Sequence, residues 1–529
     1  MTDLLGTWPL VRLIVVRDRV RLLAWIAGLV LLVIVTAAST KGLYPTQADL
    51  DAIALTAHDN PVALAFNGPD QALDTIGGQV AFQVGAFGLV MVALMSLLLL
   101  GRVTRGEEDS GRLELVRSMP VGRHAPLAAG LLVVLGTNIV VGALTTVSLL
   151  LEDLPAHGSI VFGASFVAVG VIFTGLTAVT AQVSENPRVA TGVAGAVLGA
   201  SYAVRAVGDM SGGTLSWLSP LGWAQKSRPY AGETWWPLLL CVGVGAGLTW
   251  LATALVVRRD FGAGMVAPKP GPGRATPALG TPLGLAMRLH RGAVLWWGFA
   301  VLALGLVYGS LTANIEDFLG DNPTMEDMLA ALGAASLTDS YLATSLLIMA
   351  LLATGPALQI VQRLRGEEAE QRAEAVLATG TSRAAWLGSN VVMALAAGAL
   401  GLALGGLGLG LTYAMTGGGA HQVPRLLGAA LAYVPAVWLL TGLAVAVFGL
   451  VPRWTAAGWV VLTGCLVIGM FGALLDLPGW VLDLSPFQQT PALPAAPLRV
   501  VPLAVLTSVG IGLGATGLAA FRARDLAPG

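Results

Sequence analysis

The chain has 529 residues, of which 55% are hydrophobic and 11% are charged, and its formal net charge is −1. Soluble domains carry roughly 25% charged residues, so this composition excludes a soluble protein and predicts one that crosses a membrane several times. The 2 cysteines and 5 histidines show no disulfide framework and no metal-ligand spacing. No metal site and no nucleic-acid partner are expected.

Apolar runs long enough to cross a bilayer as a helix recur along the whole chain. In the first half they lie near 22–40, 79–101, 126–150, 159–182, 188–207 and 236–257. In the second half they lie near 293–313, 341–361, 384–415, 424–450, 455–475 and 500–521. An amphipathic helix is expected to lead into the first run of each half. The predicted fold class is an all-α integral membrane protein with about 12 transmembrane helices in two tandem six-helix halves.

A connector rich in proline and glycine separates the two halves. It covers residues 258–287 and holds Pro268, Pro270, Pro272, Pro277 and Pro282. Such a composition is typical of an extended linker. We therefore predict a first transmembrane half at 1–257, a linker at 258–287 and a second half at 288–529.

The charges are sorted by loop. Arginine is concentrated in the N-terminal segment, the loop after the second run, the connector and the C-terminus, whereas the loops after the first and seventh runs are acidic. Basic loops stay on the cytoplasmic side of a membrane. Both termini and the connector are thus predicted to be cytoplasmic. The excess of arginine over lysine suggests a bacterium, so the expected location is a bacterial plasma membrane.

The most charged loop occurs twice. Arg105-Gly106-Glu107-Glu108 returns 260 residues later as Arg365-Gly366-Glu367-Glu368. The repeat continues through pairs of shorter matches: Arg112 with Arg372, Glu114 with Glu374, Arg123 with Arg383, Leu218-Ser219-Pro220 with Leu484-Ser485-Pro486, and Arg259-Asp260 with Arg524-Asp525. An even number of crossings per half gives both copies one orientation, which is a parallel repeat of the kind found in transporters.

The repeated glutamates need a role of their own, because the positive-inside rule depends on Lys and Arg and draws little on acidic residues. If the loops are helical, Glu107 and Glu114 share one face, and Glu367 and Glu374 do the same. Pairs at i,i+4 between Glu108 and Arg112, and between Glu368 and Arg372, would support exposed helices. The pattern favours short helices that present carboxylates to a partner protein. A solvated loop that only sets topology is the alternative.

This region resembles the coupling-helix region of ABC-type exporter permeases. The whole layout is similar to actinobacterial permeases described as exporters of polyketide antibiotics, the tetronasin-resistance type. The resemblance implies a type-two ABC exporter permease fold, with coupling helices near 105–120 and 365–380 that dock onto an ATPase subunit. The docking residues it implies are Arg105, Glu107, Glu108, Arg112, Glu114, Arg365, Glu367, Glu368, Arg372 and Glu374. Because the second copy departs at Ala369, Glu370, Gln371 and Gly380, the two contacts are expected to be unequal.

The chain has no G-x-x-x-x-G-K-[ST] phosphate-binding motif. We therefore expect a transport subunit rather than an enzyme, with no cofactor of its own. ATP and Mg²⁺ would be bound by two copies of a cytoplasmic ABC ATPase. The expected cargo is a hydrophobic small molecule, such as a lipophilic drug or antibiotic, moved out of the cell.

Two kinds of residue within the runs are candidates for function. Phe82, Phe87, Met91 and Met349 are interpreted either as plain packing or as the lining of an adaptable apolar substrate path. Arg205 lies near the external end of the fifth run, where we expect its side chain to reach out to the membrane surface.

Two other function classes stay open from the sequence. A major-facilitator-like, proton-coupled transporter also has two six-helix halves, but its coupling would call for an acidic residue within the runs, and none is clearly placed there. A membrane-embedded transferase acting on lipid-linked substrates would need a paired-carboxylate metal site. Asp59 and Asp321 each precede Asn-Pro, which is more typical of a helix start.

Overall fold

The computed structural model describes residues 2–58, 61–109, 111, 118, 120–259, 263–266, 273–320, 337–471 and 478–525. The chain forms two compact units, Met1–Gly271 and Pro272–Gly529. Asp59 and Asp321, which were considered for a metal site, lie outside the described residues.

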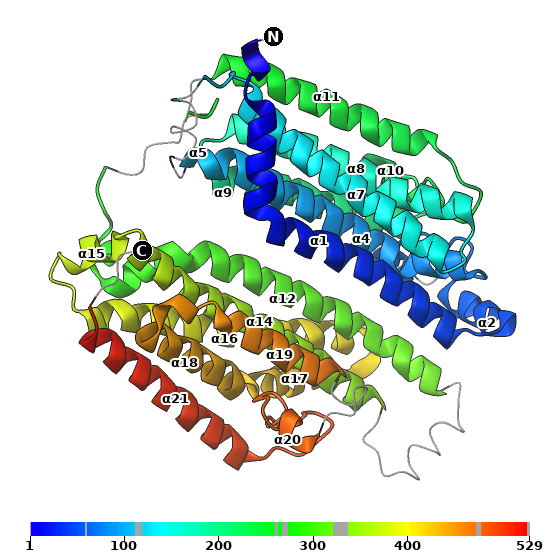
Figure 1. The fold of residues 1–529 in the computed structure, drawn as a ribbon. Helices are drawn as coiled ribbons and strands as arrows, with labels where there is room; N and C mark the ends of the chain where they lie inside the picture. The colour runs from blue at the N-terminus through cyan, green and yellow to red at the C-terminus, as the bar shows by residue number, and fades with distance from the viewer. Residues whose placement is uncertain are drawn as a thin grey trace. The chain divides into compact units, whose positions relative to one another are not determined.

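Unit 1 is built from six long helices (Figure 1). These are α1 (Thr7–Leu43), α4 (Ile76–Gly101), α7 (Ala125–Leu151), α8 (Ala156–Val183), α9 (Pro187–Met210) and α11 (Trp236–Arg258). Shorter helices α2 (Gln47–Ala57), α3 (Pro61–Asn67) and α10 (Pro220–Gln225) lie in the connections. All six predicted runs are helical. The leading amphipathic segment is not separate, because α1 continues from it into the first run without a break.

Unit 2 repeats this plan. Its helices are α12 (Pro282–Gly320), α14 (Leu337–Ala369), α16 (Arg383–Tyr413), α17 (Gln422–Leu431), α18 (Val434–Leu450), α19 (Ala457–Phe471) and α21 (Val500–Ala523), with the short α20 (Gly479–Leu482) before α21. α17 and α18 together occupy the fourth run. α12 begins at Pro282, inside the predicted linker.

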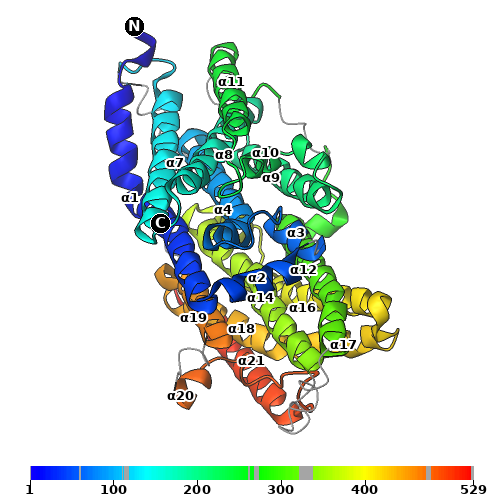
Figure 2. The same ribbon diagram turned by 90° about the vertical axis from the view of Figure 1, so that its right-hand side faces the viewer.

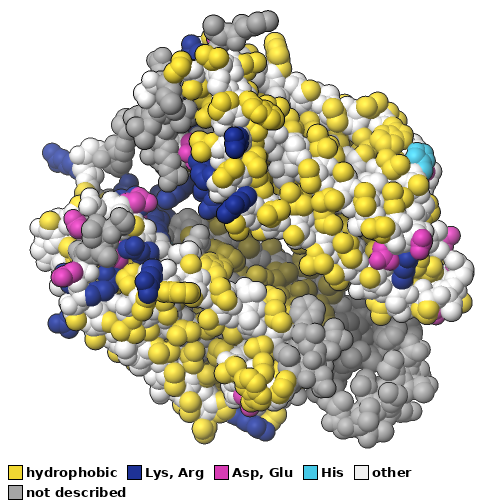
Figure 3. Space-filling view, in the orientation of Figure 1, with side chains coloured by type: hydrophobic (Ala, Val, Ile, Leu, Met, Phe, Trp, Pro, Cys, Tyr) yellow, Lys and Arg dark blue, Asp and Glu magenta, His cyan; other side chains and the backbone are white. Residues whose placement is uncertain are grey.

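The fold class is confirmed. Over the described ranges, 11 helices are long and apolar enough to cross a membrane, and α19 supplies a shorter apolar helix. The chain is therefore an all-α integral membrane protein with about a dozen membrane helices. Figure 3 shows hydrophobic side chains over the helix surfaces, as contact with lipid requires, and basic side chains near the ends where α5 (Glu107–Asp109) and α15 (Arg372–Leu377) lie.

Several long helices begin at residues that satisfy their first free N–H groups. The Thr75 hydroxyl accepts from the Gly78 N–H at 3.0 Å at the start of α4. The Asn186 side chain accepts from the Arg188 N–H at 2.9 Å at the start of α9, and Pro187 follows as the first helical residue. Ser382 accepts from Ala385 at 3.1 Å in front of α16.

The same helix pairs pack in both units (Figures 1 and 2). The first long helix packs on the third, as α1 on α7 and α12 on α16. The second packs on the fourth, as α4 on α8 and α14 on α18, and the fourth packs on the sixth, as α8 on α11 and α18 on α21. The duplication seen in the sequence is thus a duplication of packing.

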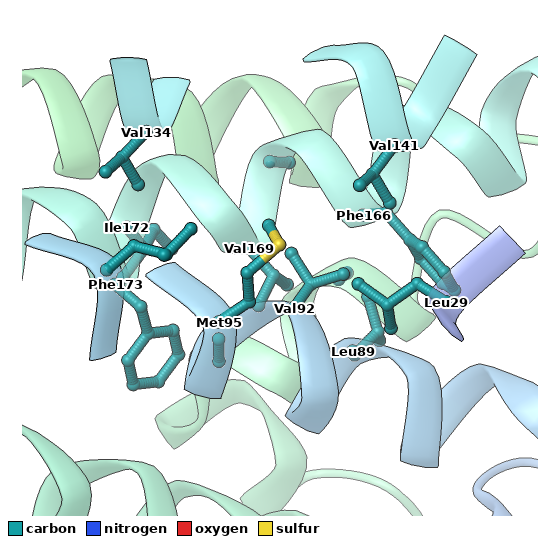
Figure 4. Close-up of a cluster of buried hydrophobic side chains, with 14 of the residues drawn as sticks. Leu29, Leu89, Val92, Met95, Val134, Val141, Phe166, Val169, Ile172 and Phe173 are labelled. Carbon is teal, nitrogen blue, oxygen red and sulfur yellow. The ribbon is translucent and has the colours of Figure 1, made fainter. Parts of the chain in front are cut away.

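Helix α8 occupies the core of unit 1. Its Phe166, Val169 and Ile172 are buried against Leu89 and Met95 of α4 (Figure 4). A buried polar contact joins α4 to α7, where the Ser96 hydroxyl donates to Asn138 Oδ1 at 3.0 Å. Such interhelical hydrogen bonds satisfy polar groups that lipid cannot.

The sixth helix of each unit touches the fourth through glycine. A Cβ added to Gly245 of α11 would lie 2.8 Å from the carbonyl carbon of Val171 in α8. A Cβ added to Gly510 of α21 would lie 2.9 Å from the Cα of Leu439 in α18. These separations leave no room for a side chain, so the backbones are in direct contact, as small residues allow in membrane helix pairs.

Candidate functional site: the charged ends of the two units

The repeated Arg-Gly-Glu-Glu of unit 1 lies where α4 ends. The helix passes through a π-helical turn at Arg102–Gly106 into the short α5. This turn directs Arg105 inward, and its side chain is only 1% exposed. Arg105 Nη1 binds Glu108 Oε2 at 2.6 Å, Nη2 donates to the Ala263 carbonyl at 2.8 Å, and Nε donates to the Ala181 carbonyl.

Glu108 joins the end of α4 to the end of α11. Its carboxylate receives two hydrogen bonds from Arg259, at 2.6 Å from Nη2 and 3.1 Å from Nη1. Arg259 follows the last residue of α11, and its Nε donates to Gln182 Oε1 at 2.6 Å. Both side chains of the pair are 9% exposed. Paired, hydrogen-bonded geometry of this kind is what keeps a buried charge tolerable.

Unit 2 contains the corresponding pair. Glu368 near the end of α14 accepts from Arg524 Nη2 at 2.8 Å, and Arg524 follows the last residue of α21. Arg524 Nε also donates to the Gly449 carbonyl at 3.1 Å, and its guanidinium lies over the rings of Phe448 and Phe521. The Glu368 side chain is 1% exposed.

A second repeated arginine, which lies at or just before the start of the third long helix, binds the backbone of the residue after the sixth helix. Arg123 Nη2 donates to the carbonyls of Val257 and Arg259, each at 3.0 Å. Arg383 Nη1 donates to the Arg524 carbonyl at 2.6 Å. In unit 1, segment 109–122 is flanked by Glu108 and Arg123, which both contact Arg259. In unit 2, segment 369–382 is flanked by Glu368 and Arg383, which both contact Arg524. We call these two segments the bracketed segments.

The first glutamate of each repeat has different partners in the two units. Glu107 is 3.0 Å from Arg17 of α1. Glu367 instead pairs with Arg363 of its own helix at 3.2 Å and with Arg372 of α15 at 2.9 Å. The two copies therefore differ in the ion pairs described at this position, and the inequality of the two ATPase contacts stays a prediction.

The second bracketed segment is not one continuous helix. α14 ends at Ala369, Gln371 has φ 60°, and α15 starts at Arg372. The predicted single face for Glu367 and Glu374 is therefore wrong, because the left-handed turn places them on two helices. The expected i,i+4 pair between Glu368 and Arg372 is also wrong. Arg372 turns back to Glu367, and Glu368 contacts Arg524.

The predicted docking residues that the structure describes fall into three groups. Arg105, Glu108 and Glu368 are enclosed within their units and hold the chain's own helix ends. Glu107, Arg365 and Glu367 are partly buried, whereas Arg372 and Glu374 of α15 are exposed. Arg112 and Glu114 lie outside the described residues. The docking role stays a prediction. Among the described candidates, those on α15 have side chains that a partner could reach.

The predicted substrate-path residues do not form one surface. Phe82 is buried beside a narrow crevice that Phe162, Ser165 and Gln225 also line. Phe87 is 53% exposed on the outside of α4, and Met91 is half-buried. Met349 is fully buried in the core of unit 2. Only Phe82 of the four lines this crevice.

Arg205 was expected to reach the membrane surface, and this expectation is wrong. Its side chain is buried, 3.3 Å from Asp209, and its Nη2 donates to the Ala65 carbonyl at 2.7 Å. It therefore caps the carboxyl end of α3, whose last carbonyls have no partner within the helix. In the same unit, burial raises the pKa of the Tyr230 phenol, which contacts the Ser159 hydroxyl at 3.0 Å, to about 12.

Within the described part of the chain, no group of three or more His, Cys, Asp or Glu side chains is placed to hold a metal ion. Comparisons with known proteins show a likeness to efflux permeases. A family model described as Multidrug efflux system permease Rv1217c, C-terminal domain, matches residues 10–256 and 279–522. One of these ranges falls in each unit.

A protein of Mycobacterium tuberculosis named Multidrug efflux system permease protein Rv1217c is 40% identical to this chain over 524 residues. The match covers 98% of this chain and 95% of that relative. The likeness therefore extends over both units and the connector between them.

Proposed function

Because the chain belongs to the family of multidrug efflux system permeases, we propose that it is the membrane subunit of an ATP-driven ABC exporter. It is a multi-pass protein of the plasma membrane and a permease for drug efflux. The finer proposal adds that two copies of a separate cytoplasmic ATPase bind it, hold ATP and Mg²⁺, and drive lipophilic drug-like or antibiotic compounds outward. The chain itself then carries out no chemical reaction.

One repeated observation carries the proposal. In both units a short segment follows the second helix and is fixed at both ends to the residue after the sixth helix. α15 in the second of these segments is anchored by buried Ala373, while Glu374 is exposed. A short charged element that is held firmly yet faces solvent is suited to receiving force from a soluble partner. The absence of a phosphate-binding motif from the sequence supports a separate source of ATP hydrolysis.

The first test is a pull-down from native membranes in mild detergent. We expect an ABC ATPase subunit at two copies per chain. In the purified complex, changing Glu114→Ala and Glu374→Ala together should weaken ATPase binding at least about tenfold, or ~1.4 kcal/mol. Asp483→Ala is the matched control, because this carboxylate lies beside α20, at the opposite end of unit 2 from Arg524. Unchanged affinity in the double variant would exclude docking through these glutamates.

Reconstitution separates this proposal from a proton-coupled carrier. When the ATPase and ATP are enclosed inside proteoliposomes, extrusion of a dye from the vesicles should require ATP hydrolysis. If the chain alone moves the same dye in response to a pH gradient, without ATP, the major-facilitator-like alternative is correct.

A further inference from the structure

We propose that Arg259 and Arg524 are positioning residues that transmit movement of the bracketed segments to the sixth helices, α11 and α21. This inference rests on the proposed function, since it names the residues through which a docked ATPase would act.

The first step is that each bracketed segment is attached to a single residue at both ends. On the side before the segment, Glu108 binds the Arg259 guanidinium at 2.6 Å. On the side after it, Arg123 binds the Arg259 carbonyl at 3.0 Å. The second unit repeats this arrangement with Glu368 and Arg383 on Arg524. A push on either segment therefore reaches the end of the sixth helix by two routes.

The second step is that the attachment is stiff. The Glu108–Arg259 pair is bidentate and almost enclosed, and Arg259 Nε is held as well by Gln182. In unit 2, Arg524 is fixed by the Gly449 carbonyl and by two aromatic rings. Separating such a pair would leave a buried charge without its partner, which is strongly unfavourable.

The third step is that the sixth helix cannot move alone. Gly245 brings α11 into backbone contact with α8, and Gly510 does the same for α21 and α18. In unit 1 the residues after α11 also bind the end of α8, where the Val266 N–H donates to the Val183 carbonyl at 3.0 Å. Displacement of Arg259 thus extends to α8, which also packs on α4.

A purely structural role for the arginines is the competing explanation. A structural pair would lower thermal stability when broken but would leave the response to ATP intact in the molecules that remain folded. A transmitting pair would lose the response itself. The two roles therefore differ in a conformational measurement, and thermal stability alone does not separate them.

The experiment measures distances between nitroxide labels in the full complex with its ATPase. Cys241 and Cys465 are buried and are first replaced by alanine. Labels are attached at Leu239→Cys and Val501→Cys, exposed positions at the outer ends of α11 and α21. In the otherwise native complex, a non-hydrolysable ATP analogue should shift the distance distribution. No shift in that complex would overturn the proposal.

The deciding variant is Arg259→Gln combined with Arg524→Gln. The ATPase should still bind, and the nucleotide-dependent shift should be lost. Arg259→Lys with Arg524→Lys keeps the charge without the two-pronged geometry and should at least halve the shift, so this pair decides the matter if the glutamine variant does not fold. Arg258→Gln with Arg522→Gln, the exposed neighbours, should behave as native.

A full shift in the folded glutamine or lysine variants would overturn the transmitting role. This outcome is distinct from failure of the proposed function, in which no ABC ATPase would bind even the native chain.

Discussion

Arg524 Nη2 donates to Glu368 Oε2 at 2.8 Å although 156 residues separate the two in the chain. Glu108 and Arg259, 151 residues apart, make the same contact at 2.6 Å in the other unit. The charges that make the repeat conspicuous in the sequence are therefore partly internal. They close each unit at the end where the second and sixth helices finish, and they leave a smaller set of charges for any partner.

Breaking the enclosed pair of unit 2 should destabilise the protein. Glu368→Gln leaves Arg524 without its counter-charge in a buried site, which typically costs about 3–5 kcal/mol. The midpoint of thermal unfolding in detergent should fall by several degrees. Glu374→Gln, on the exposed face of α15, is the control and should leave the midpoint unchanged. Equal midpoints for the two variants would contradict the burial seen here.

Arg205 should be needed for the packing of α3 on α9. Arg205→Leu removes the hydrogen bond to the Ala65 carbonyl and leaves Asp209 buried without its ion pair. A loss of several kcal/mol is expected. Arg188→Leu, exposed on the same helix, should be neutral. Hydrogen exchange over Pro61–Asn67 should rise in the first variant only, and protection that persists there would refute the capping role.

The contact between α18 and α21 should be intolerant of a methyl group. In Gly510→Ala the new Cβ would meet the backbone of Leu439 at 2.9 Å, so one helix must shift. Overpacking of this kind costs about 1–3 kcal/mol. Gly512→Ala, on the same helix with open space around it, should be harmless or slightly stabilising. The thermal unfolding midpoints of the two variants give the comparison, and a midpoint for Gly510→Ala as high as that of Gly512→Ala would be inconsistent with this contact.

The two units should respond differently to loss of a glutamate partner. Arg372→Gln removes the ion pair that links α15 to Glu367 of α14. Because Arg372 is about half exposed, the effect should be about 0.5–1 kcal/mol, or a two- to fivefold rise in hydrogen exchange over Arg372–Leu377. Arg17→Gln breaks the Glu107 pair in unit 1 and should leave exchange over α15 unchanged. A rise in both variants would argue against independent units.

Much of the fold follows from local sequence. Membrane helices need about 20 apolar residues, and that length is visible without any knowledge of tertiary contacts. The repeat was equally visible, because Arg259-Asp260 and Arg524-Asp525 were recognised as counterparts. Their partners were not, since a contact across more than 150 residues depends on how six helices pack together.

The remaining errors also have local causes. Ala369-Glu370-Gln371-Arg372 consists of good helix formers, so this stretch alone does not predict the left-handed Gln371 that separates α14 from α15. The repeat carries the missing signal, because the residue that matches Gln371 in the first copy is Gly111, which also has a positive φ of 71°. The sequence favours the membrane surface for Arg205 because its position at the end of an apolar run is visible, whereas the contact with α3 depends on tertiary packing. Met349 and Phe87 share a residue class with Phe82, but helix rotation, which composition does not reveal, puts one in the core and one outside.

The anchoring of each bracketed segment is complete within its own unit. Glu108, Arg123 and Arg259 all belong to the first half, and Glu368, Arg383 and Arg524 all belong to the second. A polypeptide of half this length would therefore contain every one of these contacts, and joining two such halves in one chain requires no new anchor. The halves can also vary around these anchors, because Gly111 in the first and Gln371 in the second share a positive φ although their side chains differ.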